Sequence, residues 1–386
     1  MTPQEELANL REQVRAVDER FYQLAAERLA LARKIGAVKK AAHLPIKDYQ
    51  TEKDVLERSR HKAREFGLPV SMGEDLAGLL IRYAVQAQDE SHRQMDRAHS
   101  APAQKVLIAG GQGRMGLWLS EFFDSFGHHV SHYAPPQEAK AGPLRYPLVH
   151  DLAAAAQHAD IIVLAAPITA TPELIDQLSD ANTKALVFDI CSLKTPLIQS
   201  IERAQAKGLA IGSVHPMFGP NVDVLAGSNI VLCEHGNAAT LERLRRLFSM
   251  TTASLHTVPL AKHDRLMGYV LGLSHLTNLV FAEALTGSGE RFTELNQVAS
   301  TTFQSQLRLA LPVVHENEHL YYEIQVENSF TPQLLHLLQK ALQKYGTAIT
   351  NRDEAAFCQL MTAARGYFND AGAATNAAAP ILAPRA

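Results

Sequence analysis

The sequence predicts a chain of three parts: an all-α helical module, an α/β domain built on a parallel sheet, and a second all-α region. Apolar residues recur every three or four positions up to residue 97, a spacing typical of helices. Short apolar runs then alternate with helical patterns between residues 105 and 258, which predicts the parallel sheet. The helical spacing returns from residue 259 onward. We therefore expect a linker at 98–104 and domains at 1–97, 105–258 and 259–386.

The composition of the 386-residue chain is that of a globular protein, with 46% hydrophobic and 20% charged residues. A net charge of −3 gives no signature of nucleic-acid binding, and no apolar run approaches the roughly 18 residues that a membrane helix needs. The N-terminus is charged from Glu5 onward, unlike a signal peptide. Cys191, Cys233 and Cys358 are widely spaced, which favours reduced thiols over disulfides or a zinc site. We expect a cytoplasmic protein with no metal, membrane or nucleic-acid partner.

One long helix is predicted from Thr2 to about Lys40. Thr2, Pro3 and Glu5 match a capping box with proline at the first helical position. Apolar residues then follow one seam at steps of three and four: Leu7, Leu10, Val14, Val17, Phe21, Leu24, Leu31, Ile35 and Val38. Such a helix spans roughly 57 Å at 1.5 Å per residue. That is long for a small monomeric domain, so we expect a second copy of the chain to pack on it.

A charged residue interrupts this seam, because Arg28 stands where an apolar residue is expected. Burying an arginine is costly unless it is paired, so a structural ion pair or a side chain that reaches solvent would explain it. Lys39 lies about three turns further along on the same face, and two converging cations indicate an anion site. Arg11 points elsewhere by helical phase, so it could serve only a neighbouring chain's site.

Two more helices are predicted in this module. Leu44-Pro45-Ile46 ends the first helix, and Asp48 and Glu52 then share one face of a second helix that runs to about Phe66. Ser71-x-x-Glu74 predicts the cap of a third helix. The expected apolar face of this third helix consists of Leu76, Leu79, Leu80 and Tyr83.

A glycine pattern opens the α/β domain. Gly111, Gly113 and Gly116 fit G-x-G-x-x-G between an apolar strand and an amphipathic helix, whereas the pattern alone would also fit a plain glycine-rich turn. In this context it predicts a Rossmann-type fold in which a diphosphate binds at the helix N-terminus. The expected cofactor contacts are Gly110, Gly111, Gly113, Arg114, Met115, Gly116, Pro167 and Ser192. The second strand ends at Tyr133-Ala134-Pro135 without carboxylate or arginine, so the choice between NAD and NADP stays open.

Further candidate residues follow later strands of this sheet, where ligands bind beyond the carboxyl ends. Ser192 and Lys194 come after the strand Leu186–Asp189, although a helix cap and a solvated lysine would also fit the spacing. His215 directly follows an apolar strand and precedes a loop rich in proline and glycine. A lone histidine is more often structural than catalytic. One that faces a nicotinamide is a good candidate base, because its pKa lies near the working pH.

The last region is predicted to be helical, with a long helix from Ala261 to Leu285 and further helices at about 290–311, 331–350 and 353–369. These later helices are expected to bury apolar faces against a second subunit. His263 and His275 lie on the long helix. The chain has 17 histidines, so most of them must be unspecialised.

Two groups of motifs resemble known families. Leu10-Arg11, Ala26-Glu27-Arg28, Gly36 to Lys39, and Asp48 with Glu52 resemble the all-helical chorismate mutases. The motifs Gly-Gly-x-Gly-x-Met-Gly, Asp-x-x-Ser-x-Lys (189–194) and His-Pro-Met-Phe-Gly-Pro (215–220) resemble the prephenate dehydrogenases. Together the chain is similar to the bifunctional chorismate mutase/prephenate dehydrogenase family over nearly its whole length.

The first resemblance implies a homodimer of intertwined chains that rearranges chorismate to prephenate. Arg28 and Lys39, with Arg11 of the partner chain, would hold the carboxylates and the ether oxygen, and Asp48 and Glu52 would face the hydroxyl. Catalysis would select a compact conformer and stabilise charge at the breaking C–O bond.

The second resemblance implies NAD-dependent oxidative decarboxylation of prephenate to 4-hydroxyphenylpyruvate, with NADP not excluded. His215 would accept a hydrogen bond or proton from the C4 hydroxyl, and Ser192 would orient both groups. His263 and His275 would contact the substrate.

The chain departs from these families in three places. Thr51 stands where the mutases have arginine, and Ser91 leads to Met95, with Gln94 one place from the expected amide or acid. Gln304 aligns with an arginine that grips the ring carboxylate, and Arg308 lies one turn further on the same face. A variant acting on the 4-amino-4-deoxy analogues, or a non-catalytic relative that binds cofactor or an aromatic ligand, therefore stands as the alternative.

Overall fold

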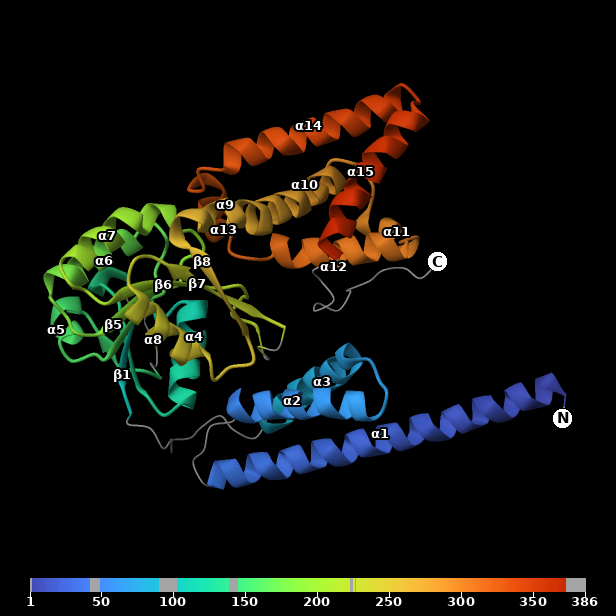
Figure 1. Cartoon of the computed structure of the whole chain (residues 1–386), viewed down its shortest axis with the longest axis horizontal. Helices are drawn as coiled ribbons and strands as arrows, with labels where there is room; N and C mark the ends of the chain where they lie inside the picture. The colour runs from blue at the N-terminus through green and yellow to red at the C-terminus, as the bar shows by residue number, and fades with distance from the viewer. Residues whose placement is uncertain are drawn as a thin grey trace. The chain divides into compact units, whose positions relative to one another are not determined.

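The computed structural model describes residues 2–41, 49–89, 103–138, 145–222, 225 and 227–372. The chain divides into two compact units, residues 1–260 and 261–386. Three helices form the N-terminal module, a mixed sheet with helices on both faces follows, and the second unit is helical (Figure 1). Among the described residues, no helix combines the length and apolarity required to cross a membrane.

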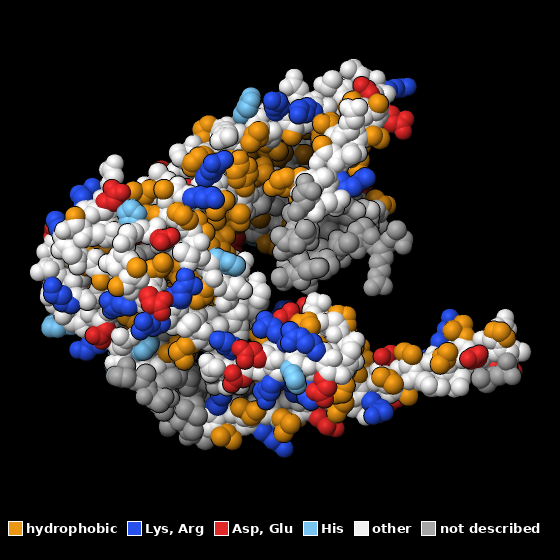
Figure 2. All heavy atoms as spheres, viewed as in Figure 1, with side chains coloured by type: hydrophobic (Ala, Val, Ile, Leu, Met, Phe, Trp, Pro, Cys, Tyr) orange, Lys and Arg blue, Asp and Glu red, His pale blue; other side chains and the backbone are white. Residues whose placement is uncertain are grey.

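The N-terminal module consists of α1 (Pro3–Ala41), α2 (Tyr49–Glu65) and α3 (Val70–Asp89). The predicted capping box is confirmed, because Thr2 N donates to Glu5 Oε2 at 2.7 Å and Glu5 N donates to Thr2 Oγ1 at 3.3 Å. The apolar seam of α1 is 48% to 66% exposed in the single chain, and Figure 2 shows apolar side chains along this helix. Nothing in the described part of one protomer therefore covers this seam.

The third helix differs from its prediction. Gly73 N donates to Pro69 O, so the helix begins at Val70 and Ser71 already lies inside its first turn. Its buried face consists of Gly73, Ala77 and Ile81, whereas Leu79 and Tyr83 are exposed. The physical reason is close helix packing: a Cβ at Gly73 would lie 2.8 Å from the Cβ of Ala63 on α2, so the glycine is needed where the two helices approach at this point.

The α/β domain is an eight-stranded sheet of order β3-β2-β1-β4-β5-β6-β7-β8. Its strands are β1 (Lys105–Ala109), β2 (His129–Tyr133), β3 (Leu148–Val149), β4 (Ile161–Leu164), β5 (Leu186–Asp189), β6 (Ile211–Pro216), β7 (Asn229–Glu234) and β8 (Ser254–Pro259). The first six run parallel, as predicted, but β7 pairs antiparallel with β6, and β8 runs parallel to β7. The described residues of the connection from β6 to β7 form no helix, and the chain returns in the opposite direction.

Helices cover both faces of this sheet (Figure 1). They are α4 (Arg114–Ser125), α5 (Leu152–Ala156), α6 (Thr171–Asp180), α7 (Ile198–Ala206) and α8 (Ala238–Phe248), with short 3₁₀ turns η1 (Pro136–Glu138) and η2 (Thr195–Leu197). The main core lies between the sheet and the helices α4 and α8, where Phe122 stacks on Phe248 with ring centroids 5.8 Å apart. Strands β4 and β5 are buried throughout because both of their faces are covered.

The second unit contains α9 (Leu260–Met267, whose first residue closes the first unit), α10 (Ser274–Thr286), α11 (Phe292–Gln297), α12 (Thr301–Val314), α13 (Glu318–Val326), α14 (Thr331–Thr350) and α15 (Glu354–Gly372). The long helix predicted from Ala261 to Leu285 is interrupted by a π-helical segment, Gly268–Leu273. A Cβ at Gly268 would lie 3.0 Å from Leu334 Cδ1, so the glycine allows α14 to approach the segment closely.

Candidate active sites

The glycine turn between β1 and α4 has the geometry of a dinucleotide cradle. Gly110 has a φ of +81°, and a Cβ there would lie 2.5 Å from Ala165 O at the end of β4. A Cβ at Gly116 would lie 2.2 Å from Gly110 O, so the helix packs directly onto the turn. Gly113 is the N-cap of α4 and has no side-chain cap. The N-terminus of α4 therefore lies directly at the turn, where the helix dipole favours a phosphate, as the motif requires.

The remaining predicted cofactor residues surround this turn. Arg114 is exposed and donates to Asn221 Oδ1 at 3.3 Å, while Met115 packs against the core. Pro167 is exposed after β4, and its carbonyl accepts from Thr171 Oγ1 at 2.9 Å. Ser192 is half-buried in the turn after β5. All of them lie at the carboxyl edge of the parallel strands, where a ligand binds in such sheets.

The buried, hydrogen-bonded pair Ser120 and His132 packs against the glycine turn. Ser120 Oγ donates to Gly116 O at 2.7 Å, so it must accept from His132 Nε2, which lies 2.8 Å away. A Cβ at Gly111 would lie 2.3 Å from His132 Cδ2, so the imidazole fills the space under the turn. Burial lowers the pKa of His132, which keeps the ring neutral in this position.

Lys194 is not a solvated lysine. It is fully buried, and its Nζ donates to Asp189 Oδ1 at 2.6 Å and to Val214 O at 2.9 Å. Burial acts to lower the pKa of Lys194, but the charge of Asp189, with Cys233 and Cys191, outweighs it and raises this pKa overall. The ammonium therefore ties the end of β5 to the end of β6.

His215 lies on β6, one residue from its carboxyl end, and is buried. It is paired in register with Val231 of β7 and directly follows Val214, the residue held by Lys194. The structure thus places His215 and Ser192 at the carboxyl ends of the neighbouring strands β6 and β5. An imidazole at this edge has the position of a base in a dinucleotide-dependent reaction.

Arg28 and Lys39, the two cations of the predicted anion site, lie on one face of α1. Arg28 is half-buried and turns to α3, where its Nη1 donates to Leu80 O at 2.8 Å; burial lowers its pKa. Lys39 is half-buried on the same face as Arg28, and Glu52 on α2 is buried at 6% exposure. Asp48, Ser91, Gln94 and Met95 lie outside the described residues.

Arg11 is exposed and lies apart from this face. It is 17 positions before Arg28, which is about 25 Å along the helix axis. Arg11 and Arg28 of one chain therefore cannot reach the same small ligand.

The second unit holds the other three predicted residues. His263 is buried, and its Nδ1 lies 2.7 Å from Oδ1 of Asp264, whose carbonyl accepts from Asn328 Nδ2. His275 stacks on Tyr321 with ring centroids 4.3 Å apart, and burial lowers its pKa. Arg308 is exposed on α12, one turn after the exposed Gln304, and donates to Ser305 Oγ at 2.8 Å. Arg308 thus lies on the same face of α12 as Gln304, the residue that stands in place of the expected arginine.

Two structural roles were not predicted from the sequence. The buried Lys194–Asp189 pair had a usable signal, because Asp189 ends one buried strand and Lys194 follows it closely in the sequence. The support of Gly111 by His132 had none, since the contact joins the turn after β1 to strand β2 through the fold.

Three family models match the chain in succession. They are chorismate mutase type II over residues 10–89, the prephenate dehydrogenase nucleotide-binding domain over residues 126–257, and the prephenate dehydrogenase dimerization domain over residues 259–363. The second match begins after the glycine turn. The geometry of the turn, and not this family model, therefore indicates the dinucleotide cradle.

Two similar proteins align with nearly the whole chain, and a solved structure shares the fold of its larger part. The T-protein of Enterobacter agglomerans is 24% identical over 368 residues, which cover 95% of this chain and 94% of that protein. The T-protein of Haemophilus influenzae is 24% identical over 372 residues, covering 96% and 94%. The crystal structure of a prephenate dehydrogenase from A. aeolicus, in complex with hydroxyphenyl propionate and NAD+, has the same fold at a TM-score of 0.57 and 19% identity, covering 70% of this chain and 99% of that one.

Proposed function

Because this chain belongs to the bifunctional chorismate mutase/prephenate dehydrogenase family, we propose that it catalyses two consecutive steps of tyrosine biosynthesis. The first rearranges chorismate to prephenate, and the second converts prephenate to 4-hydroxyphenylpyruvate with NAD. The observation that carries the proposal is that one chain contains both kinds of site. The helical module has Arg28 turned to α3, and the α/β domain has a dinucleotide cradle at the sheet edge where β6 ends near His215.

The rearrangement takes place in the helical module. Arg28 and Lys39 of one chain, joined by Arg11 of its partner, bind the two carboxylates and the ether oxygen of chorismate. Asp48 and Glu52 face the hydroxyl. The half-buried cations favour the compact conformer and stabilise negative charge on the ether oxygen as its C–O bond breaks. No nucleophile is required for this intramolecular reaction.

The oxidation takes place at the carboxyl edge of the sheet. The glycine turn, Arg114, Met115, Pro167 and Ser192 hold the cofactor, which supplies the acceptor for the hydride lost from C4 of prephenate. His215 accepts the proton of the C4 hydroxyl, and Ser192 orients the two groups. The bond to the ring carboxylate then breaks, CO2 leaves, and its electron pair completes the aromatic ring.

We also propose that three residues of the second unit contact the substrate. His263 and His275 contact prephenate. Arg308 binds the ring carboxylate of prephenate and so replaces the arginine expected at the position of Gln304. The position of Arg308 supports this role, since it is exposed on the same helix face as Gln304. A guanidinium there can form the charge-assisted bond that an amide cannot.

We further propose that the protein is a cytoplasmic homodimer. The exposed apolar seam of α1 and the match of residues 259–363 to a dimerization domain support the dimer. The free thiols of Cys191, Cys233 and Cys358 support a reducing compartment. In this organisation residues 1–97 form the mutase, 105–258 the cofactor domain and 259–386 the substrate and dimerization domain, joined by the linker 98–104.

The experiment that tests the oxidative step is NADH formation from prephenate by the wild-type protein and by His215→Asn. We expect turnover in the wild type and a loss of kcat of about 10²-fold or more in the variant, because asparagine cannot take up the proton. Wild-type turnover that His215→Asn leaves intact would assign the base elsewhere, and a wild type inert toward prephenate would contradict the proposed function.

A further inference from the structure

We infer that His150 takes the place of the missing carboxylate and accepts a hydrogen bond from the 2′-hydroxyl of the adenosine ribose of NAD. This inference rests on the proposed binding of NAD at the glycine turn. In dinucleotide-binding sheets of this kind, an acidic residue near the end of the second strand usually makes that bond. Here β2 ends at Tyr133, and Ala134 and Pro135 follow.

The sheet register brings His150 to this position. Strands β2 and β3 are parallel, and Tyr133 is paired with Val149, so Ala134 and His150 are the next residues beyond the two strands. Ala134 N donates to Val149 O at 3.3 Å. The same end of β2 is joined to the glycine turn, because Gly110 N donates to Tyr133 O at 3.2 Å. The imidazole and the cradle thus lie at the same edge of the sheet, after β3 and β1, the two strands that flank β2.

The hydrogen bond of His150 fixes which ring nitrogen is left for a ligand. Its Nδ1 lies 2.8 Å from Ala134 O, and a carbonyl oxygen can only accept, so Nδ1 carries the proton. In the neutral ring Nε2 is then an acceptor with a lone pair. This is the one side-chain hydrogen bond of the exposed His150 within the described part of the chain, so Nε2 is available to a ribose hydroxyl.

Two carboxylates lie near this edge in the sequence. Asp151 is the N-cap of α5, and its Oδ1 already accepts from Ala154 N at 2.9 Å. Glu138 ends the 3₁₀ turn η1, five residues past the end of β2. Glu138 is therefore the competitor that an experiment must exclude.

The test compares the affinity of the full-length protein for NAD with its affinity for the analogue that lacks the adenosine 2′-hydroxyl, both measured by calorimetry. For the wild type we expect the analogue to bind about tenfold more weakly, the loss of one hydrogen bond. His150→Ala should bind NAD about tenfold more weakly and should no longer distinguish the two ligands. His150→Asp, which restores an acceptor, should recover both the affinity and the discrimination.

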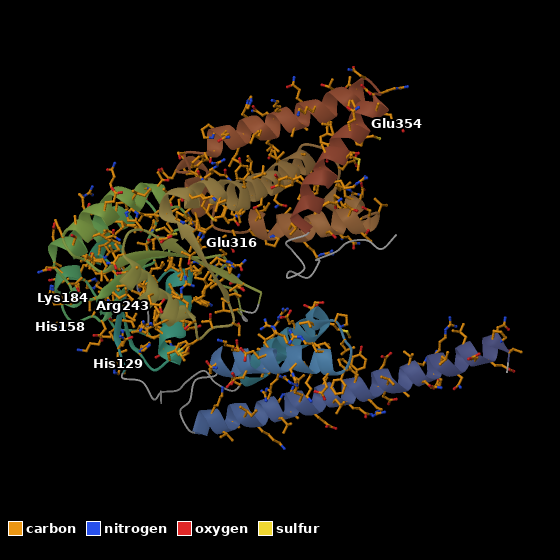
Figure 3. All side chains as sticks on the ribbon, viewed as in Figure 1. His129, His158, Lys184, Arg243, Glu316 and Glu354 are labelled. Atoms are coloured by element: carbon orange, nitrogen blue, oxygen red, sulfur yellow. The ribbon has the colours of Figure 1, made fainter. Side chains whose placement is uncertain are left out.

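Matched variants separate this contact from an indirect effect. His158→Ala removes another exposed histidine of the same domain, labelled in Figure 3, and should change neither affinity. The inference is overturned if His150→Ala keeps the discrimination against the analogue, or if Glu138→Gln is the variant that abolishes it. A wild-type protein that binds no NAD would instead contradict the proposed function.

Discussion

The ammonium of Lys194 lies 2.6 Å from Oδ1 of Asp189, and neither side chain is exposed to solvent. The same ammonium donates to Val214 O, directly before His215. This buried pair therefore joins the ends of β5 and β6 where the proposed base is positioned. The carboxylate is held further by Cys191 N, which donates to Asp189 Oδ1 at 3.0 Å.

Lys194→Met should lower the free energy of unfolding by about 3–5 kcal/mol, because it leaves the charge of Asp189 buried without its partner. Urea unfolding followed by circular dichroism measures this change. Lys184→Met is the control, since Lys184 is an exposed lysine of the same domain, labelled in Figure 3, and should change stability by less than about 0.5 kcal/mol. Equal effects of the two substitutions would show that the buried pair contributes nothing to stability.

Gly116→Ala should weaken NAD binding by about 100-fold or more. Its Cβ would lie 2.2 Å from Gly110 O and 2.7 Å from Gly111 Cα, and these backbone atoms form the phosphate cradle. Quenching of protein fluorescence by NADH measures the affinity. Gly346→Ala, a helical glycine whose added Cβ would meet nothing within 4 Å, should leave binding unchanged. An alanine at position 116 that binds NADH normally would show that the turn does not hold the cofactor.

Acid should destabilise the protein partly through His132. Burial lowers the pKa of His132 below its ordinary value of 6.5, so the unfolded chain takes up the proton more readily than the folded one. The stability contributed by the neutral ring is complete above pH 6.5 and is lost as the pH falls through the lowered pKa. His132→Gln, which can still donate to Ser120 Oγ, should therefore lose less stability between pH 7 and pH 5 than the wild type. The exposed His158→Gln should follow the wild-type curve, and a His132→Gln curve identical to it would remove His132 from the acid response.

Arg11 and Arg28 should complement each other across the dimer. Arg11→Ala and Arg28→Ala should each reduce mutase turnover by about 10²–10³-fold, since each removes one electrostatic contact from every site. When the two variants are mixed and allowed to exchange subunits, a heterodimer has one site that contains both arginines. The mixture should then recover about a quarter of the wild-type rate. No recovery despite proven exchange would show that Arg11 does not serve the site of the partner chain.

The sequence predicted most of the secondary structure because strong local signals agree with the fold. The capping box at Thr2 and the buried strand at Leu186–Asp189 were correct. The reversal of β7 was not predicted, since an apolar strand has the same pattern in either direction. The start of α3 was misplaced because Ser71-x-x-Glu74 fits a cap equally well inside a first turn.

The site could be predicted only as far as its residues lie in local motifs. The glycine turn and His215 stand next to strands, so the chain order alone places them at the sheet edge. The contacts of Arg28 with Leu80 and of His132 with Ser120 join residues far apart in sequence or on different elements, and depend on packing. The position of His150 beside Ala134 depends on the register of β3, a two-residue strand with little signal of its own.

The most direct test of the two-step account is NADH formation when the purified protein receives chorismate and NAD, with no other enzyme present. The account predicts a signal that Arg28→Ala removes with chorismate but not with prephenate, and that His215→Asn removes with both. Absence of NADH from chorismate, while prephenate is turned over, would contradict the mutase half. No NADH from either substrate would contradict the account as a whole.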